Sequence, residues 1–550
     1  MVWGILESTR LEHVPGTSLL GVDSSADSAA NQSTALKRGK GRHAATVLVP
    51  QPSNDGNDPL HWPLWQRDLL FTLYLYCTLL TVGGIGPLLS ASALTLIKIF
   101  DITFTEVTML TGWQLVAVGS LGIFLSALSH KYGKRPGFIF SMTCALVGTL
   151  WGGAAKSYGS LVGARVLEGL GVSMFESVMF SIIGDMYFVH ERGVRVALLT
   201  LCISALGNLP AVLSGLITET LGWRWMFWML AIFLAIGWVL VLLFGEETAF
   251  NRHSIFDTDI SSVNNVNLIA AVKNESSHVE NTATTETDKA ATTEHEVADD
   301  QEFVPRKPFI QRLKVFDSTY TDENLPTLIV KPFLILVNPA VIWSTLLLSI
   351  STAWIVVIGF VSAQIFSYPP YNLDATHLGY LNGGNVVGGV LGCIAAGALS
   401  DPLATWLSKK NKGIYEPEFR LPLLIPWMAF TAISFFLLGW MCENGSSPVA
   451  VAAIQGIGLV GFQFMSVSLS TYMIDAYRSI SVEVFIIGMV AKNFVFFGLS
   501  FGVNNWVAAW GPKRVFDVIG GIQLALFGLS IPMWIFGKQL RACFHSKRTS

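Results

Sequence analysis

LVGARVLEGLGVSMFESVMFSIIG, residues 161–184, is an almost entirely apolar run of the length that a helix needs to cross a lipid bilayer. Such a helix takes about 20 apolar residues to span a hydrocarbon core roughly 30 Å thick, where no backbone group can stay unpaired. Three charged residues, Arg165, Glu168 and Glu176, interrupt the run. A charge at the bilayer centre costs about 2.5–3.5 kcal/mol, so the stretch predicts a spanning helix whose charges face the protein interior.

Further apolar runs along the chain predict a polytopic membrane protein. With the quoted stretch they lie at 69–97, 107–129, 137–155, 161–184, 194–217, 225–245, 333–366, 378–399, 421–441, 449–473, 484–507 and 518–536. The composition agrees, because 52% of the residues are hydrophobic and only 13% are charged, whereas soluble proteins carry roughly 25% charged residues. We therefore expect an all-α integral membrane protein with twelve transmembrane helices in two pseudo-symmetric six-helix bundles.

An internal repeat relates the two sets of runs. Residues 126–130 resemble 397–401, residues 168–176 parallel 455–463, residues 185–187 parallel 475–477, and residues 222–227 parallel 511–516. Four short matches in the same order indicate a duplication. Duplicated bundles usually bind their solute where they meet, near the middle of the membrane.

The polar segments set the expected domain boundaries. We expect a disordered cytosolic N-terminal tail at 1–64, a first bundle at 65–245, a largely disordered cytosolic loop at 246–331, a second bundle at 332–538 and a cytosolic tail at 539–550. The central loop contains an Ala/Thr/Glu-rich tract that is too polar to bury a core. Within it, 309–316 is expected either as a short amphipathic helix on the membrane surface or as an unstructured tether.

Lys and Arg in the short loops predict the orientation, since these residues are retained on the cytoplasmic side. The loops after the second, fourth and eighth runs are the basic ones. Both termini are then cytosolic, and the loop with Asn444, Gly445 and Ser446 lies outside, where Asn444 is a candidate glycosylation site.

The charges of the fourth run share one side of their helix. At 100° per residue, Glu168 and Glu176 lie about 60° to one side and about 20° to the other side of Arg165. One interpretation is a wet cavity in which Glu176 takes and releases a proton while Arg165 sets the electrostatics. The alternative is a structural pair of Arg165 with Glu168 on adjacent turns, with Glu176 hydrogen-bonded to a neighbouring helix.

Lys492 is the second intramembrane charge, and there it needs an acid, carbonyl groups or water. Snorkelling of its side chain to the cytosol is an equally simple explanation. Other polar or aromatic residues in the runs are candidates for the solute cavity, although hydrogen bonds between helices explain each amide equally well. These candidates are Gln114, Trp113, Asn385, Gln455, Gln463 and Asn493.

Several functional classes are excluded or disfavoured. The net charge of −3 gives no basic footprint for nucleic acid. The six cysteines are scattered singly, which disfavours a metal site or a disulfide framework. Motifs for hydrolases, metalloproteases and ATP binding are not found in a suitable context. We expect no enzyme activity, no metal and no cofactor, and energy from a solute gradient or the membrane potential.

The loop after the second run resembles the signature G-x-x-x-D-R-x-G-R-R of the major facilitator superfamily. Ser126 replaces its glycine and His130 its aspartate, while the matching residues are Lys131, Gly133, Lys134 and Arg135. Arg165 and Gly169 match the R-x-x-x-G pattern of the fourth span. Motifs similar to those of the fungal drug:proton antiporter branch, which also includes polyamine-permease-like members, stand at 58–63, 190–193, 413–420 and 475–478.

The resemblance implies a proton-coupled transporter, with lipid, protons and a small organic solute as its partners. It associates Arg165 with proton coupling. The candidate gating residues are His130, Lys131, Gly133, Lys134, Arg135, Asp185, Asp401, Asp475 and Arg478. In the fifth span, Leu209 stands where the antiporter motif has glycine before Pro210, which weakens the case for antiport.

We expect a monomer in the plasma membrane that exports a secondary metabolite or drug-like compound by alternating access. An uptake permease for polyamines or other organic cations is the main alternative. A non-transporting nutrient sensor is an alternative of another class.

Overall fold

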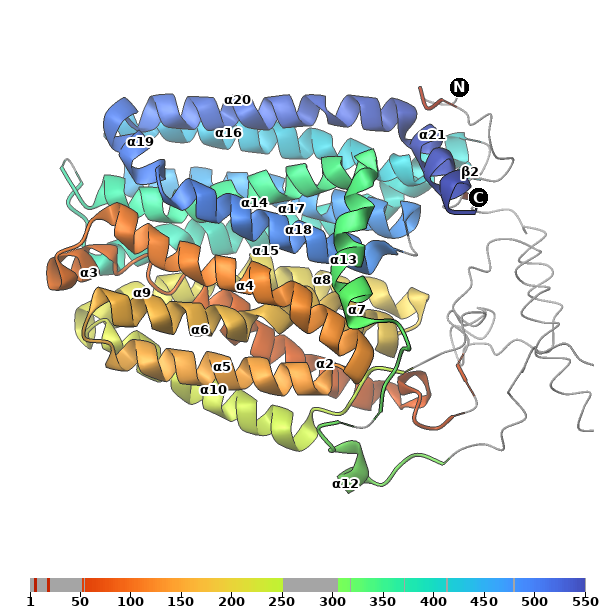
Figure 1. Ribbon diagram of the computed structural model, residues 1–550. Coiled ribbons are helices and arrows are strands. Elements are labelled where there is room, and N and C mark those ends of the chain that lie inside the picture. Colours follow the sequence, from red (N-terminus) through yellow and green to blue (C-terminus); the bar gives the residue numbers. More distant parts are fainter. Residues whose placement is uncertain are drawn as a thin grey trace, which may run out of the picture.

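The computed structural model describes residues 4–6, 17–19, 52–53, 55–250, 305–316, 318–369, 371–411, 414–477 and 480–549. Within these residues, twelve helices are long and apolar enough to cross a membrane. The expectation of twelve spanning helices is therefore confirmed. They run nearly parallel, with the first-half helices (red to yellow) beside the second-half helices (green to blue), and both chain ends lie at the same end of the bundle (Figure 1).

In the described residues, the first half contains nine α-helices and a π-helical segment. They are α2 (Leu64–Thr78), continued by the π-helical Leu79–Ile85, α3 (Ala93–Phe100), α4 (Phe104–Tyr132), α5 (Arg135–Ala154), α6 (Tyr158–Ser177), α7 (Met179–Met186), α8 (Val189–Ser204), α9 (Leu209–Thr220) and α10 (Arg224–Phe244). A capping box fixes the start of α4, because Thr103 Oγ1 accepts from Glu106 N at 3.3 Å and Glu106 Oε2 accepts from Thr103 N at 2.7 Å.

The second half repeats this plan after a connecting segment. Its elements are α12 (Phe309–Arg312), α13 (Leu325–Leu334), α14 (Pro339–Phe366), α15 (Ala375–Lys410), α16 (Leu424–Glu443), α17 (Pro448–Ala476), α18 (Ser481–Ser500), α19 (Val503–Trp510), α20 (Pro512–Gly528) and α21 (Ser530–Thr549). One short strand pair joins distant segments, with β1 (Ser18–Leu19) antiparallel to β2 (Ile414–Tyr415). Helix α21 continues through most of the range expected as a C-terminal tail.

Two helix pairs hold the halves together, α4 against α18 and α9 against α15. Small residues allow these close crossings. A Cβ on Gly215 in α9 would collide with the carbonyl oxygen of Ala375 at the start of α15. A Cβ on Gly112 in α4 would meet the Ser500 hydroxyl at the end of α18.

Two expected spans are shorter in the structure. The first ends at Ile85 rather than Ile97, because the chain turns at Gly86 and Pro87 and then forms the separate helix α3. The seventh begins at Pro339 rather than Phe333, because the preceding residues form α13. Proline cannot donate a backbone hydrogen bond, so it favours a break between helices at both places.

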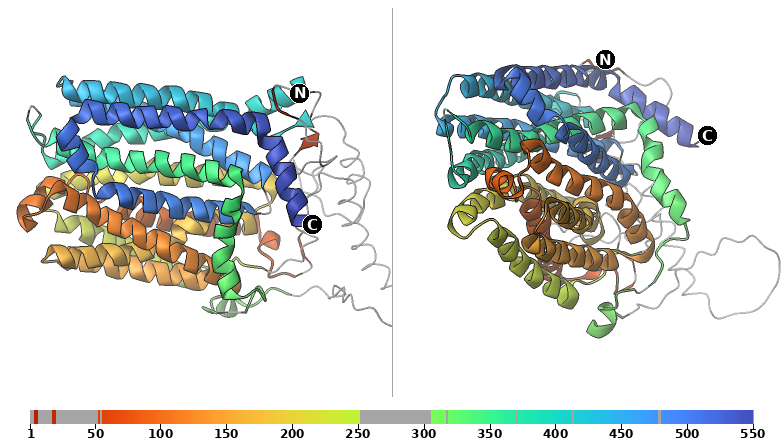
Figure 2. Two further views of the ribbon diagram at one scale, coloured as in Figure 1. Left: turned by 45° about the horizontal axis from the view of Figure 1, so that its top comes forward. Right: turned by 60° about the vertical axis from the view of Figure 1, so that its left-hand side comes forward.

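Helix α13 lies across the ends of the spanning helices, on the side where the chain termini lie (Figure 2). It contacts α4 of the first half and α18 of the second half. The expected amphipathic segment at 309–316 contains only the single turn α12. The surface helix of this region is therefore α13, about a dozen residues further along the chain.

Candidate functional site

The first charged cluster of α6 lies inside the first half. Arg165 and Glu168 are both fully buried, and Arg165 Nη1 is 2.7 Å from Glu168 Oε2. The same nitrogen donates to the Ile85 carbonyl at 3.0 Å, and Nη2 donates to Gln114 of α4. The cluster therefore joins α6 to α4 and to the π-helical end of the first span.

This cluster is closed off from bulk solvent, and its ion pair is the one that the structural interpretation of Arg165 and Glu168 expects. Arg165 Nε and Gln114 Nε2 are buried without a hydrogen-bond partner in the described part of the chain. A buried polar group that lacks a hydrogen-bond partner destabilises a protein by about 1–3 kcal/mol. Such unpaired groups are often retained at functional sites.

The second cluster joins the two halves. Lys492 Nζ of α18 forms an ion pair with Glu176 Oε1 near the end of α6. Asn493 Nδ2 donates to Glu176 Oε2 at 3.3 Å, and Lys492 Nζ is 3.3 Å from Asn493 Oδ1. The Glu176 carboxylate is thus held by two neighbouring residues of the opposite half.

The two acids of α6 differ in accessibility. The Glu176 side chain is 10% exposed and that of Lys492 is 20% exposed, whereas those of Arg165 and Glu168 are 0% exposed. Glu176 lies eight residues beyond Glu168, about 12 Å along the helix. The structure therefore separates the three charges into two clusters instead of one shared surface, and only the cluster between the halves is accessible.

Close packing of α4 against α18 positions this second cluster. A Cβ on Gly119 would lie 3.3 Å from the Asn493 Cβ, and a Cβ on Gly122 would meet the Met489 methyl group. Further toward the end of the bundle that carries the termini, Phe180 of α7 stacks on Phe485 of α18, with ring centroids 5.1 Å apart. Apolar contacts thus flank the ion pair.

The remaining candidates for the solute cavity lie elsewhere between the helices. Trp113 of α4 packs edge-on against Phe497 of α18, with ring centroids 5.0 Å apart. Gln463 Nε2 donates to the Gly389 carbonyl at 3.3 Å, and Gln455 Nε2 donates to Ser362 Oγ at 2.8 Å. Both amides act between helices of the second half, as the alternative interpretation expects.

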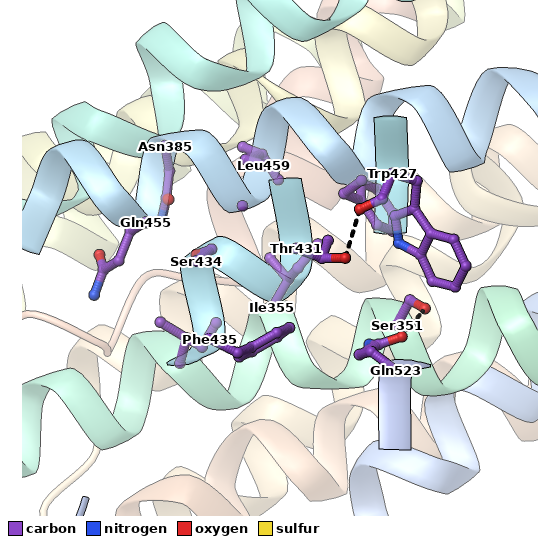
Figure 3. Close-up of a pocket in the computed structure, with 13 residues that line it drawn as sticks. Ser351, Ile355, Asn385, Trp427, Thr431, Ser434, Phe435, Gln455, Leu459 and Gln523 are labelled. Atoms are coloured by element: carbon purple, nitrogen blue, oxygen red, sulfur yellow. Dashed lines mark hydrogen bonds between the residues drawn. The ribbon is translucent and has the colours of Figure 1, made fainter. Parts of the chain in front are cut away.

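Asn385 and Gln455 line a small cavity inside the second half. Its other polar walls include Ser351 and Gln523, which are hydrogen-bonded at 3.1 Å, and Thr431 (Figure 3). The cavity volume of about 20 Å³ suits a single water molecule and is too small for an organic solute.

The basic loop after α4 is fixed by two acids. Lys134 forms an ion pair with Asp185 of α7 and donates to Ser181 Oγ at 2.7 Å. The backbone amides of Lys134 and Arg135 donate to the Glu247 carboxylate at 2.9 and 3.0 Å. Burial raises the pKa of Glu247, and these amide bonds act in the opposite direction.

The other expected residues of this loop have simpler surroundings. Gly133 has φ +95°, and a Cβ on it would collide with the Glu247 carboxylate, so the turn requires glycine. Lys131 Nζ donates to the Glu323 carbonyl at 3.1 Å, just before α13. His130 is exposed at the end of α4.

The second half has a comparable cluster at the same end of the bundle. Arg420 Nη1 donates to Asp401 Oδ1 at 2.6 Å, and its Nε is 3.3 Å from Asp475 Oδ2. Tyr415 OH also bonds Asp475. Arg478 lies outside the described residues. Asn444 is exposed at the opposite end of the bundle, between α16 and α17.

Residues 74–512 match the family model described as Major Facilitator Superfamily. The chain belongs to this superfamily. An uncharacterized MFS-type transporter of Schizosaccharomyces pombe is 24% identical, covering 96% of this chain and 93% of that protein. A probable efflux pump, mfs2, of Aspergillus flavus is 23% identical over 81% of this chain and 97% of that protein. The MFS antiporter QDR3 of Candida albicans is 22% identical over 89% and 80%.

A solved superfamily structure has the same fold. The proton:xylose symporter XylE bound to 6-bromo-6-deoxy-D-glucose aligns with a TM-score of 0.57 at 13% identity, covering 86% of this chain and 96% of that one. The relatives agree with the fungal drug:proton antiporter branch that the motifs indicate. The chain is a multi-pass membrane transporter of this superfamily.

Two residues of the charged clusters at the end of the bundle that carries the termini were not predicted from the sequence, Glu247 and Tyr415. Glu247 directly follows the sixth span, and its position beside Glu246 was the available signal. Tyr415 stands within the motif at 413–420, but its bond to Asp475 spans 60 residues and depends on tertiary structure. The pairing of Glu176 with Lys492, 316 residues apart, is of the same kind.

Proposed function

We propose that the protein is a proton-coupled secondary transporter that exports a small organic compound by alternating access. The observation that carries this proposal is the ion pair of Glu176 with Lys492. It combines an acid that can take a proton with a contact between the two halves. The proposal places the protein in the plasma membrane as a monomer, with both termini in the cytosol.

Protonation of Glu176 weakens this contact. Two unit charges about 4 Å apart attract each other by about 4 kcal/mol at an effective dielectric constant of 20. A neutral Glu176 loses that attraction and leaves Lys492 to water or to a solute. The halves then separate more easily at α6 and α18, which couples proton binding to the change of access.

The buried pair of Arg165 and Glu168 has a different proposed role. Its partners all lie within the first half, so it moves as one body with α6, α4 and the end of the first span. We assign it to positioning α6, with Arg165 setting the field near Glu176. The efflux pump and the antiporter among the relatives support export as the direction of transport.

Uptake of polyamines or other organic cations is the second candidate. The Glu176 carboxylate already holds the alkylammonium group of Lys492, with Asn493 as a further ligand. A solute ammonium has the same chemistry and would compete with Lys492 for this position. Uptake of labelled spermidine by cells with and without the protein separates this function from export.

An untargeted comparison of metabolites inside and outside cells, with and without the protein, tests the proposal. Export predicts a compound that is depleted inside and enriched outside when the protein is present. Glu176→Gln should abolish this difference when it is compared with the wild type at equal protein level in the membrane. If cells with Glu176→Gln show the same metabolite difference as cells with the wild type, the coupling role of Glu176 is refuted. A protein that binds its ligand without transporting it would instead be a sensor.

A further inference from the structure

A groove on the outer surface of the second half runs between α15 and α17. Its volume is about 660 Å³, within the range of small-molecule sites, roughly 300–1,000 Å³. Large apolar residues on its rim face away from the protein, with Val387 60%, Leu391 57% and Val449 79% exposed. Because α15 and α17 are spanning helices and these rim residues are exposed, this surface faces the bilayer, whose components can enter the groove.

The floor of the groove is flat. Gly384 of α15 lies against the backbone of Ala452, and Gly388 lies against Gly456, so the two helices meet there without a side chain of α15 between them. From His377 to Leu391 the groove follows 15 residues of α15, a rise of about 21 Å. A flat, rigid apolar molecule about two-thirds as long as the hydrocarbon core is thick fits this shape.

The polar end of the groove lies at the end of the bundle away from the termini, where His377 and Tyr380 line it and Asp374, just outside the lining, pairs with His377. Asp374 Oδ1 accepts from His377 N at 2.8 Å and is 2.6 Å from His377 Nδ1. The rings of His377 and Tyr380 meet edge to face, with centroids 6.1 Å apart. The backbone bond from His377 lowers the pKa of Asp374, so this carboxylate stays charged at neutral pH.

The charge of Asp374 discriminates between bilayer components. An anionic lipid headgroup at this end would be repelled by the carboxylate, whereas a neutral hydroxyl can donate a hydrogen bond to it. We propose that the groove between α15 and α17 binds one sterol molecule, with its hydroxyl at Asp374 and His377 and its fused rings along the glycine floor. The sterol would then pack on the helix that forms the α9–α15 contact between the halves.

The chain offers a matched pair of variants for the test. Gly383 lines the groove, and a Cβ added there meets nothing within 4 Å, so Gly383→Leu begins in open space and places its side chain in the groove. Gly397 of the same helix is also exposed to open space but lies outside the groove lining. Gly397→Leu is therefore the control for an added leucine on α15.

The experiment uses the full-length protein in phosphatidylcholine vesicles with a photoactivatable sterol. We expect saturable labelling of peptides from α15 and α17, competed by unlabelled sterol, about tenfold weaker in Gly383→Leu and unchanged in Gly397→Leu. Asp374→Asn, which keeps a helix-capping side chain, should reduce the preference for the sterol over its 3-keto analogue. Equal labelling of the two glycine variants, or labelling that excess sterol does not displace, would overturn the proposal and indicate ordinary phospholipid at the groove.

Discussion

The ion pair of Glu176 with Lys492 predicts a specific pattern of stabilities in a double-mutant cycle. Lys492→Met leaves the Glu176 carboxylate without its cation, and Glu176→Gln leaves the Lys492 ammonium without its anion. Removing one partner of a buried pair costs about 3–5 kcal/mol. Because the two side chains are 10% and 20% exposed, water offsets part of this loss.

We therefore expect each single variant to lose about 2–3 kcal/mol, and the double variant to lose little more than one of them. The coupling energy between the two sites is then about 2 kcal/mol. Apparent melting temperatures of the purified variants in detergent give the ranking. Measurement at several heating rates is needed, since membrane proteins often unfold irreversibly.

A second ion pair of the chain provides the control. Lys513 and Glu443 join α20 to α16 at 3.7 Å, but their side chains are 46% and 55% exposed. Exposed pairs contribute about 0–1 kcal/mol, so the corresponding cycle should show almost no coupling. If the double variant at Glu176 and Lys492 loses as much stability as the two single variants together, the two residues are not coupled. That result would refute the inference that these residues hold the halves together.

Three further predictions concern the ends of the bundle. Asp401→Ala removes an acceptor of Arg420 and should reduce transport more than His130→Ala, in a flux assay at equal expression; equal effects would contradict an asymmetric gate. Glu247→Ala leaves two backbone amides without their acceptor and should cost about 2 kcal/mol, seen as a lower melting temperature, and an unchanged value would show that water replaces the carboxylate. Asn444→Gln should remove a glycan and increase electrophoretic mobility in protein from eukaryotic cells, and unchanged mobility would leave Asn444 unmodified.

The architecture could be predicted from the sequence because a helix that crosses a membrane needs an apolar run as long as the hydrocarbon core is thick. The twelve runs and the repeat of 168–176 at 455–463 predicted twelve spans in two halves. Hydropathy could not separate α13 from the seventh span, because an apolar surface helix and a spanning helix have similar residues. Pro339 was the local signal that the spanning helix begins there.

The candidate site was only partly predictable, for a physical reason. The pair of Arg165 with Glu168 follows from their spacing of three residues on one helix. The partner of Glu176 does not, because α6 and α18 meet only in the folded protein. Lys492 and Asn493 were named as candidates, but their contact with Glu176 depends on the small residues Gly119 and Gly122 of α4.

Transport in proteoliposomes that contain purified protein and the identified metabolite tests the central claim most directly. In the wild type, an imposed pH gradient should drive accumulation of the metabolite. Glu176→Gln should still exchange labelled for unlabelled metabolite, which shows that the protein is folded, but its flux should not respond to the gradient. Gradient-driven accumulation by Glu176→Gln at the wild-type rate would contradict the assignment of Glu176 as the proton-coupling residue.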